Sequence, residues 1–227
     1  KKYRVGVVGG AGTWGRQDLG AFAERGDCEV VLVDRSIDRA RHFADQLGVD
    51  TVLQNLEELL SDVVPDVVSA ILPVSQTYGA VLACAEAGVK AILCEKPLAV
   101  SMEDTNHMLK ACKDNGVHLS VGHTRRWRRL YHKVRETVRS GAIGPIDTIV
   151  ASHWGRRAML FRNGTHSIDL INFFAGTDPQ WVTAELEAGF EHFSEYQGDG
   201  GRDPDTDPYA SAYIRFADGI RAFYNSY

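Results

Sequence analysis

A glycine-rich segment near the start of the chain has the residue types that bind a phosphate group. Gly10, Gly12 and Gly15 stand in the spacing Gly-x-Gly-x-x-Gly, directly after an apolar run typical of a buried parallel strand. At this spacing the first glycine permits a tight turn, the second lets the backbone approach a pyrophosphate, and the third lets a helix pack closely on the strand. The helix N-terminus then offers amide groups and the positive end of its dipole to the phosphates.

An acidic residue stands where the ribose of a bound dinucleotide would lie. The apolar run at 30–33 indicates a second strand that ends in Asp34. Asp34 follows Gly15 at close to the spacing of about 20 residues that separates the last glycine from a ribose-binding carboxylate. A glycine-rich turn alone is a weak signal, because many structural turns contain glycines. Here strand, turn, helix, strand and acid follow in order, which favours dinucleotide binding.

The residues around Asp34 predict which dinucleotide is bound. A carboxylate accepts hydrogen bonds from the ribose hydroxyls and repels a 2′-phosphate, so we expect NAD to be preferred. Arg35, Ser36 and Arg39 leave NADP as an alternative, because an arginine and a hydroxyl can hold that phosphate.

Alternating strand and helix patterns position these residues up to about residue 122. Apolar runs predict strands at 3–8, 30–33, 51–53, 66–72, 89–94 and 117–121, and helical periodicity predicts helices at 17–25, 36–47, 56–60, 76–87 and 102–115. This alternation is typical of βαβ units around a parallel sheet, where ligands bind at the carboxyl ends of the strands. The residues that directly follow strands are therefore site candidates: Gly10, Asp34, Pro73, Glu95, Lys96, Pro97 and His123.

The pattern changes after Arg125 and indicates a second domain of α+β character. The sequence predicts a basic helix at 128–139, an apolar-faced helix at 165–174, and strands at 146–154, 181–190 and 210–216. Asp218-Gly219 is a hairpin signal after the last of these strands, and the chain ends in a further strand pattern. We expect a dinucleotide-binding domain at 1–124, a largely antiparallel α+β domain at 125–227, and a mobile loop at 198–204.

Composition limits the classes of partner. The chain has 227 residues, a formal net charge of −5 and a pI of about 5.9, which argues against nucleic-acid or membrane-surface binding. The arginine-rich stretches 125–129 and 156–157 could contact nucleic acid, but solvated faces and salt bridges are the simpler interpretation in an acidic chain. No apolar run reaches the ~18 residues of a membrane helix, and no signal peptide is evident.

The cysteines and histidines show no metal-ligand pattern. Cys28, Cys84, Cys94 and Cys112 have no Cys-x-x-Cys spacing, and the last three lie in apolar patterns where buried free thiols are expected. The eight histidines do not fall at metal-ligand spacings either, so we expect no metal. Free thiols favour a cytoplasmic location. The first residue is Lys rather than Met, so we expect a trimmed or processed start.

Six motifs occur in an order that resembles one known family. They are Pro73 after a strand, the Ala-Gly run at 84–90, Cys94-Glu95-Lys96-Pro97, the segment 122–127, the Gly-x-Ile-Gly turn at 140–146, and Gly164-Thr165-His166-Ser167-Ile168-Asp169. They are similar to those of the glucose–fructose oxidoreductase, inositol dehydrogenase and rhizopine catabolism (Gfo/Idh/MocA) family of NAD(P)-dependent oxidoreductases, over residues 3 to about 190. In that family Glu-Lys-Pro follows the fifth strand of a Rossmann domain, and the segment at 122–127 is Gly-aromatic-Asn-Arg-Arg-Phe.

The resemblance implies a fold and an activity. It implies an α/β protein with an N-terminal Rossmann domain and a C-terminal α+β domain built on an open sheet. It also implies a homo-oligomer, dimer or tetramer, that transfers a hydride between a nicotinamide cofactor and a CH–OH or C=O group of a sugar, polyol or sugar-acid-like substrate. A catalytically silent dinucleotide-sensing regulator and an NAD-dependent glycosidase are the alternatives. The expected cofactor contacts are Gly10, Gly12, Thr13, Trp14, Gly15, Asp34, Arg35, Pro73, Glu95 and Lys96.

Lys96 and His166 are the candidate catalytic residues. Hydride transfer from a carbinol needs a group that takes the hydroxyl proton, and partial withdrawal from water lowers a lysine pKa towards the neutral range. A surface lysine paired with Glu95 is the alternative, which its place between a buried strand and a proline disfavours. His166 stands at a helix start, where the dipole favours a neutral imidazole, and could carry a proton or donate to a hydroxyl. An ordinary helix-start histidine is the alternative. Asp169, one turn on, could orient His166 or cap the helix locally.

Two features depart from the family pattern. Polyol-oxidising members have an aspartate four residues before the histidine, where this chain has Arg162. A guanidinium matches a carboxylate or phosphate, so we expect an anionic substrate group, with Arg126, Arg162 and Asp169 as substrate-binding residues. Alternatively, Arg162 points outward and pairs with an acid of the 198–207 segment. The family also continues beyond the position of Tyr227, so we expect a C-terminal domain that is incomplete, or a short member.

Overall fold

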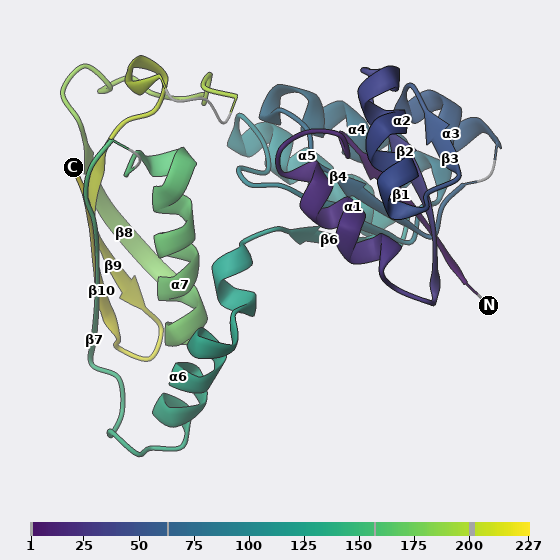
Figure 1. Cartoon of the computed structure of the whole chain (residues 1–227). Coiled ribbons are helices and arrows are strands. Elements are labelled where there is room, and N and C mark those ends of the chain that lie inside the picture. The colour runs from purple at the N-terminus through teal and green to yellow at the C-terminus, as the bar shows by residue number, and fades with distance from the viewer. Residues whose placement is uncertain (1, 63, 157, 200–202) are drawn as a thin grey trace. The chain divides into compact units, whose positions relative to one another are not determined.

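The chain divides into two units, Lys1–Gly122 and His123–Tyr227, and each is described by itself. The computed structural model in Figure 1 describes residues 2–62, 64–156, 158–199 and 203–227. Residue 157 of the expected arginine pair, and residues 200–202 of the expected mobile loop, lie outside that part of the chain. The expected class, an α/β protein with a second domain of α+β character, is confirmed.

The first unit is a parallel sheet with helices between successive strands (Figure 1). Its strand order is β3-β2-β1-β4-β5-β6, and all neighbours are parallel. The strands are β1 (Tyr3–Val8), β2 (Cys28–Val33), β3 (Thr51–Leu53), β4 (Val67–Ala70), β5 (Ala91–Cys94) and β6 (His118–Val121). The helices are α1 (Gly15–Ala23), α2 (Ile37–Leu47), α3 (Leu56–Asp62), α4 (Val74–Ala87) and α5 (Met102–Asp114). The order reverses between β1 and β4, which is where such sheets bind ligands.

Two apolar cores cover the two faces of this sheet. Leu32 of β2 belongs to one core with Leu19 of α1 and Ala44 of α2. Val31 and Val33, on the other side of the same strand, belong to the second core with side chains of α4 and α5. Burial on both faces explains why the strands read as continuous apolar runs rather than alternating ones.

The expectation of buried free thiols is confirmed within the second of these cores. Cys84, Cys94 and Cys112 are buried and reduced, while Cys28 is half-buried. Burial raises the pKa of the Cys84 and Cys94 thiols to about 12, because a thiolate is poorly solvated there. These thiols are therefore packing residues rather than nucleophiles.

The second unit is a four-stranded sheet with one helix packed on it. The sheet order is β7-β10-β9-β8; β9 is antiparallel to both neighbours and β10 is parallel to β7, so the sheet is mixed and largely antiparallel as expected. The strands are β7 (Thr148–His153), β8 (Pro179–Leu186), β9 (Ala210–Phe216) and β10 (Arg221–Ser226). The helical elements are η1 (Thr124–Trp127), α6 (Arg129–Arg139), η2 (Leu160–Gly164), α7 (Thr165–Ala175) and η3 (Pro204–Thr206). Gly219, with φ of +95°, turns the β9–β10 hairpin.

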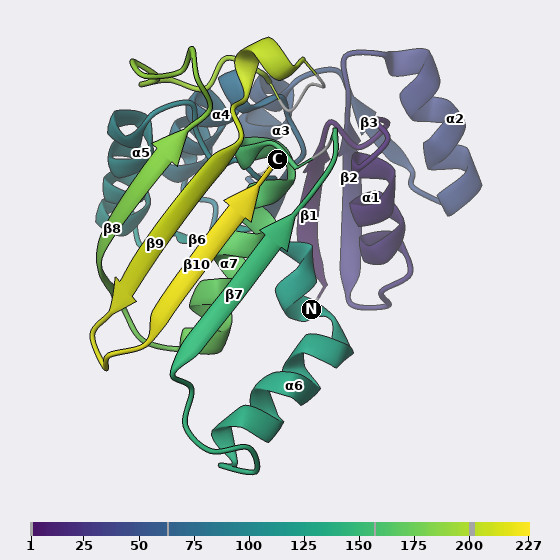
Figure 2. The ribbon, with the colours of Figure 1, turned by 90° about the vertical axis from the view of Figure 1, so that its left-hand side faces the viewer.

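The two faces of this sheet differ. Ile214, Phe216 and Tyr224 are buried in a core with Ile171 of α7. The opposite face, turned to the viewer in Figure 2, exposes an aromatic row in which the rings of Trp181 and Phe223 each lie 5.1 Å from that of Tyr213. No helix of the described residues is long and apolar enough to cross a membrane.

Candidate functional site

The glycine turn after β1 is built around a close backbone approach. Gly9, the residue before the fingerprint, has φ of +76° and is the left-handed residue of the turn. Gly10 is needed for space, since a Cβ there would lie 2.3 Å from Cδ1 of Leu32. A Cβ on Gly15 would lie 2.1 Å from the carbonyl oxygen of Gly9, so only glycine lets α1 begin this close to β1.

Gly12 has a different reason to lack a side chain. A Cβ there would meet a single heavy atom within 4 Å, the carbonyl oxygen of Gly9 at 3.2 Å, so a shift of a few tenths of an ångström would accommodate it. The open side of Gly12 lines a cavity instead. Beside it α1 begins, and although the amides of Arg16 and Gln17 bond to the carbonyl oxygens of Gly12 and Trp14, the positive end of the helix dipole lies here. The turn therefore fits a pyrophosphate that approaches at Gly12.

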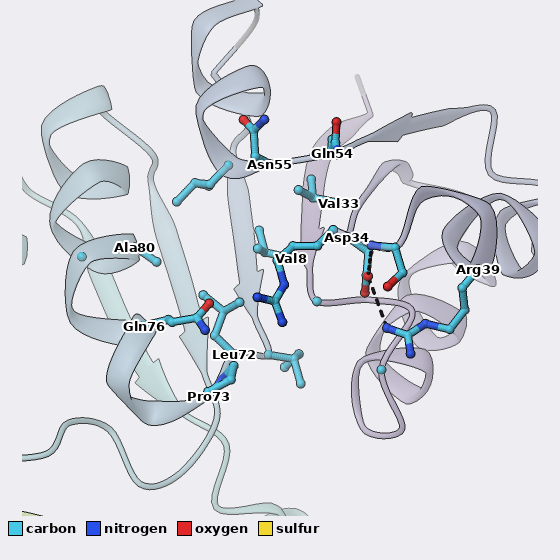
Figure 3. Close-up of a pocket in the computed structure, with 17 residues that line it drawn as sticks. Val8, Val33, Asp34, Arg39, Gln54, Asn55, Leu72, Pro73, Gln76 and Ala80 are labelled. Carbon is cyan, nitrogen blue, oxygen red and sulfur yellow. Dashed lines mark hydrogen bonds and ion pairs between the residues drawn. The ribbon is translucent and has the colours of Figure 1, made fainter. Parts of the chain in front are cut away.

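Asp34 lies at the carboxyl end of β2 and is only 8% exposed. Its carboxylate accepts hydrogen bonds from the backbone amides of Ala11 (3.1 Å) and Ser36 (2.9 Å). Arg39 donates to the same carboxylate from 3.4 Å and keeps about half of its side chain in solvent. Figure 3 shows Asp34 and Arg39 together on one side of the cavity, with Gln76 and Pro73 across from them.

This strand-end cavity has a volume of about 470 Å³, which is in the range of small-molecule and cofactor sites. Of the expected cofactor contacts it brings together Gly12, Asp34, Arg35 and Pro73, whereas Gly10, Thr13, Trp14, Gly15, Glu95 and Lys96 do not line it. Side chains that the sequence reasoning did not select also line it: Gln54, Asn55, Leu72 and Gln76. Gln54 and Asn55 directly follow β3, so the rule of residues after strands could have found them.

The Glu95-Lys96-Pro97 tripeptide follows β5, as expected. Glu95 and Lys96 are half-buried, and the Lys96 backbone amide donates to Oε2 of Glu95 over 3.2 Å. Burial raises the pKa of Glu95 above its ordinary value, although the positive charge of Lys96 acts in the opposite direction. A Cβ on Gly122 would lie 3.2 Å from Oε1 of Glu95, so the glutamate packs beneath a glycine at the end of β6.

His166 is the second residue of α7 and is 9% exposed. Asp169, which the sequence suggested as its orienting partner, is instead bound by Arg126: Nε lies 3.1 and 3.0 Å from the two carboxylate oxygens, and Nη2 also donates. The Arg126 guanidinium also lies over the ring of Phe173, 5.5 Å from its centre. The Arg126–Asp169 pair thus links η1 to α7 within the second unit.

His123 lies among these residues although the sequence gave it no role. Its Nε2 is 2.9 Å from Oγ1 of Thr165, and its Nδ1 is 3.8 Å from Oδ1 of Asp169. Its ring meets that of His166 edge to face. The signal available in the sequence was its position two residues after the end of β6. Among the described residues, no group of three or more His, Cys, Asp or Glu side chains could hold a metal ion.

Arg162 lies inside the second unit rather than on its surface. It is 8% exposed, so the alternative in which Arg162 points outward is wrong. An acid of the 198–207 segment is nonetheless close: Asp207, 2% exposed, accepts hydrogen bonds from the backbone amides of Phe161 and Arg162, each at 2.9 Å. The buried carboxylate fixes the turn that precedes α7.

Fold and cavity together define a protein with a dinucleotide-binding Rossmann domain followed by an α+β domain. Two family descriptions match it: "Oxidoreductase family, NAD-binding Rossmann fold" over residues 3–123, and "GFO/IDH/MocA C-terminal domain" over residues 131–226. The chain belongs to the Gfo/Idh/MocA family of oxidoreductases, as its motifs had indicated.

Relatives with assigned activities are longer than this chain. It is 30% identical over 200 residues to a myo-inositol 2-dehydrogenase of Thermotoga maritima, covering 80% of this chain and 58% of that protein. It is 31% identical over 197 residues to a D-apiose dehydrogenase of Paraburkholderia graminis, covering 78% and 50%. A crystal structure of a dehydrogenase from Chromobacterium violaceum shares the fold with a TM-score of 0.83 and 21% identity, covering all of this chain and 66% of the other.

The two kinds of glycine can be separated by substitution. Gly15→Ala places a methyl group against a backbone carbonyl, so we expect about 2 kcal/mol or more of lost stability and a Tm lower by roughly 4–8 °C. Gly12→Ala should lower the Tm far less than Gly15→Ala and weaken NAD binding by about tenfold or more, equal to about 1.4 kcal/mol. Gly20→Ala, in open space on α1, is the matched control. Unchanged NAD affinity in Gly12→Ala would contradict the assignment.

Asp34 and Arg39 should act in opposite directions on cofactor choice. Asp34→Ser removes the charge that repels a 2′-phosphate, so we expect the preference for NAD over NADP to narrow or reverse. Arg39→Gln removes a cation beside the same carboxylate and should increase the preference for NAD over NADP. Asp34→Asn removes the charge but keeps an acceptor for the Ala11 amide, so it distinguishes the effect of the charge from that of a changed turn. Fluorescence titration with both cofactors measures these effects, and tighter NADP binding by the unmodified protein would show the assignment to be wrong.

Proposed function

We propose that this chain carries the cofactor-binding part and part of the substrate-binding part of an NAD(P)-dependent dehydrogenase acting on CH–OH groups. The observation that carries the proposal is the strand-end cavity, in which the open side of Gly12 and the buried carboxylate of Asp34 line one space. The named activities of the two curated relatives support a sugar or polyol as substrate. The chain spans only 50% to 58% of those relatives, so the complete activity is part of the proposal.

Proton transfer falls to residues of this chain. A nicotinamide, when bound, supplies the site that accepts or returns the hydride. Lys96 would take the hydroxyl proton of the carbinol at Nζ, or return it in the reverse direction. Half-burial supports this role, because it keeps the amine partly away from water, and the Glu95 contact holds the lysine backbone. Glu95, which packs beneath Gly122, would border the cofactor.

His166 would serve as a second proton carrier or as a hydroxyl donor to the substrate. Its place at the N-terminal turn of α7, largely buried, supports this role. Arg126 and Asp169 bind each other, so we propose that they border the substrate as a neutral pair. Thr13 and Trp14 on the glycine turn would contact the cofactor; Trp14 is 60% exposed and thus accessible.

The cofactor is proposed to be NAD, with NADP as the alternative. Asp34 supports NAD through its charge in the cavity, while Arg35, Ser36 and Arg39 line the same cavity and could hold a 2′-phosphate. Asp34, Arg35 and Pro73 would therefore bind the adenosine half.

An anionic substrate group, as in a sugar acid, is proposed for the position of Arg162. A buried guanidinium is costly unless negative groups lie near it, and a substrate carboxylate would add one. Asp207, which binds the backbone at this turn, is the competing source of negative charge.

Self-association and location complete the proposal. Exposed Trp181 and Phe223, on either side of half-buried Tyr213, support assembly into a homo-oligomer through the open sheet face, because apolar patches of this kind mark protein interfaces. The free thiols support a reducing, cytoplasmic setting.

Substitution of Lys96 tests the activity. Lys96→Ala should lower kcat by about 10²–10⁴-fold, the usual size of a general acid–base contribution. Lys96→Arg should lose as much, because a guanidinium keeps the charge but does not release its proton. NAD affinity should change little in either, since Lys96 does not line the strand-end cavity. Lys90→Ala, which removes an exposed lysine paired with Asp66, is the matched control.

Three outcomes separate the candidate functions. Turnover of free NAD with sugars, polyols or sugar acids supports the dehydrogenase. Sugar release at constant NAD identifies a glycosidase. NAD binding without either reaction, and with the same NAD affinity in Lys96→Ala, identifies a silent dinucleotide-sensing regulator.

Substrate charge is tested at Arg162. Arg162→Gln should lower kcat/KM for an anionic sugar by about 10–100-fold relative to its matched neutral sugar, the size expected for lost hydrogen bonds to a charged group. Arg162→Lys keeps the charge of the buried site without the two-pronged geometry and should lose less. Equal activity on both sugars, unchanged by either substitution, rules the anion site out.

A further inference from the structure

His123 has no role in the proposed hydride transfer, yet it contacts three residues at the start of α7. Nε2 lies 2.9 Å from the hydroxyl of Thr165, and Nδ1 lies 3.8 Å from the carboxylate of Asp169. Its ring stands at 89° to the ring of His166, with the centres 5.8 Å apart. All four residues belong to the second unit, so these contacts are defined within one body.

The nearby carboxylate favours one of the two positions for the proton of a neutral His123. A carboxylate only accepts hydrogen bonds, and Asp169 is itself held in place by the two-pronged contact with Arg126. A proton on the Nδ1 edge is attracted by Asp169, 3.8 Å away, which favours that tautomer. In that tautomer Nε2 is an acceptor and the Thr165 hydroxyl donates to it.

This hydrogen bond reaches the residue that precedes His166. Thr165 is the first residue of α7, so its hydroxyl ties the first turn of the helix to His123. The edge-to-face contact then acts on the His166 ring itself, because this arrangement of two rings is one of the favoured ones. Backbone and ring of His166 are thus both restrained by one side chain.

We propose that His123 is a positioning residue that holds the imidazole of His166 in its working orientation. The inference rests on the proposed role of His166 in the dehydrogenase. Proton transfer and hydrogen bonding to a substrate hydroxyl depend on where the imidazole nitrogens point, and small misplacements reduce the rate strongly. His123 itself need not touch the substrate.

Two variants each remove one partner of the hydrogen bond between His123 and Thr165. His123→Phe keeps a ring against His166 but has no acceptor for Thr165, and Thr165→Val keeps the shape of Thr165 but has no hydroxyl. Thr165→Ser restores the hydroxyl and is the rescue variant. His192→Phe replaces an exposed histidine of the same unit and is the matched control.

Ring resonances of histidines labelled with ¹⁵N give a readout that needs no activity. In the unmodified protein, His123 should show its proton on Nδ1. We expect His123→Phe and Thr165→Val each to shift the His166 ring signals, while Thr165→Ser and His192→Phe leave them in place. Unchanged His166 signals in both of the first two variants would overturn the inference, whatever the activity.

Steady-state kinetics test the catalytic consequence. His123→Phe and Thr165→Val should each lower kcat by about 10–100-fold with an unchanged KM for NAD. The double variant should lose no more than the worse single one, because both remove the same contact. A loss confined to the substrate KM would overturn the inference by making His123 a binding residue. Shifted His166 signals in a protein that turns over no substrate would count against the dehydrogenase and still support the positioning of the ring.

Discussion

The geometry of the first unit depends on how closely α1 approaches the end of β1. The carbonyl oxygen of Gly9 occupies the space that a side chain on Gly15 would need, so the helix begins almost against the strand. That approach aims the first amides of α1 towards the carboxyl ends of the strands. The hydrogen bond from the Ala11 amide to Asp34 then ties the turn to the end of β2. The helix α1, the glycine turn and the Asp34 carboxylate are therefore held together, and their arrangement shapes the strand-end cavity.

The second unit uses buried polar contacts for the same purpose. Asp207 accepts the backbone amides at the turn before α7, and Gly164 is required there because a Cβ would lie 2.1 Å from the hydroxyl of the fully buried Tyr224. Residues Leu160–Gly164 form a π-helical turn, an irregularity that is frequent at functional sites. Buried charges add little net stability, because the desolvation cost offsets their attraction. Here they specify the orientation in which α7, and with it His166, begins.

Local sequence patterns predicted the features of the fold that depend on neighbouring residues. The apolar runs, the helix-ending glycines and the residues that follow strands gave the parallel sheet and placed Asp34 and Pro73 in the cavity. What the sequence did not predict depends on distant contacts. A Cβ on Gly9 would lie 2.2 Å from the carbonyl oxygen of Ile71, and the pairing of Arg126 with Asp169 joins residues 43 positions apart. His123 was selected only as a residue after a strand, because its partners come from a helix that sequence spacing does not bring near it.

Cofactor choice in this cavity depends on more than the presence of an acid after β2. A carboxylate has about four acceptor positions. In Asp34 the amides of Ala11 and Ser36 and the guanidinium of Arg39 already use three of them. In the proposed cofactor site, a pair of ribose hydroxyls would therefore compete with a contact already made. The Arg39 contact would yield first, because it is the longest of the three at 3.4 Å and its side chain is half in solvent. An Arg39 side chain released from Asp34 would stay beside the ribose position, where a cation attracts a 2′-phosphate. The same movement would free the acid for NAD and leave the cation for NADP, so selectivity would rest on the balance between the two.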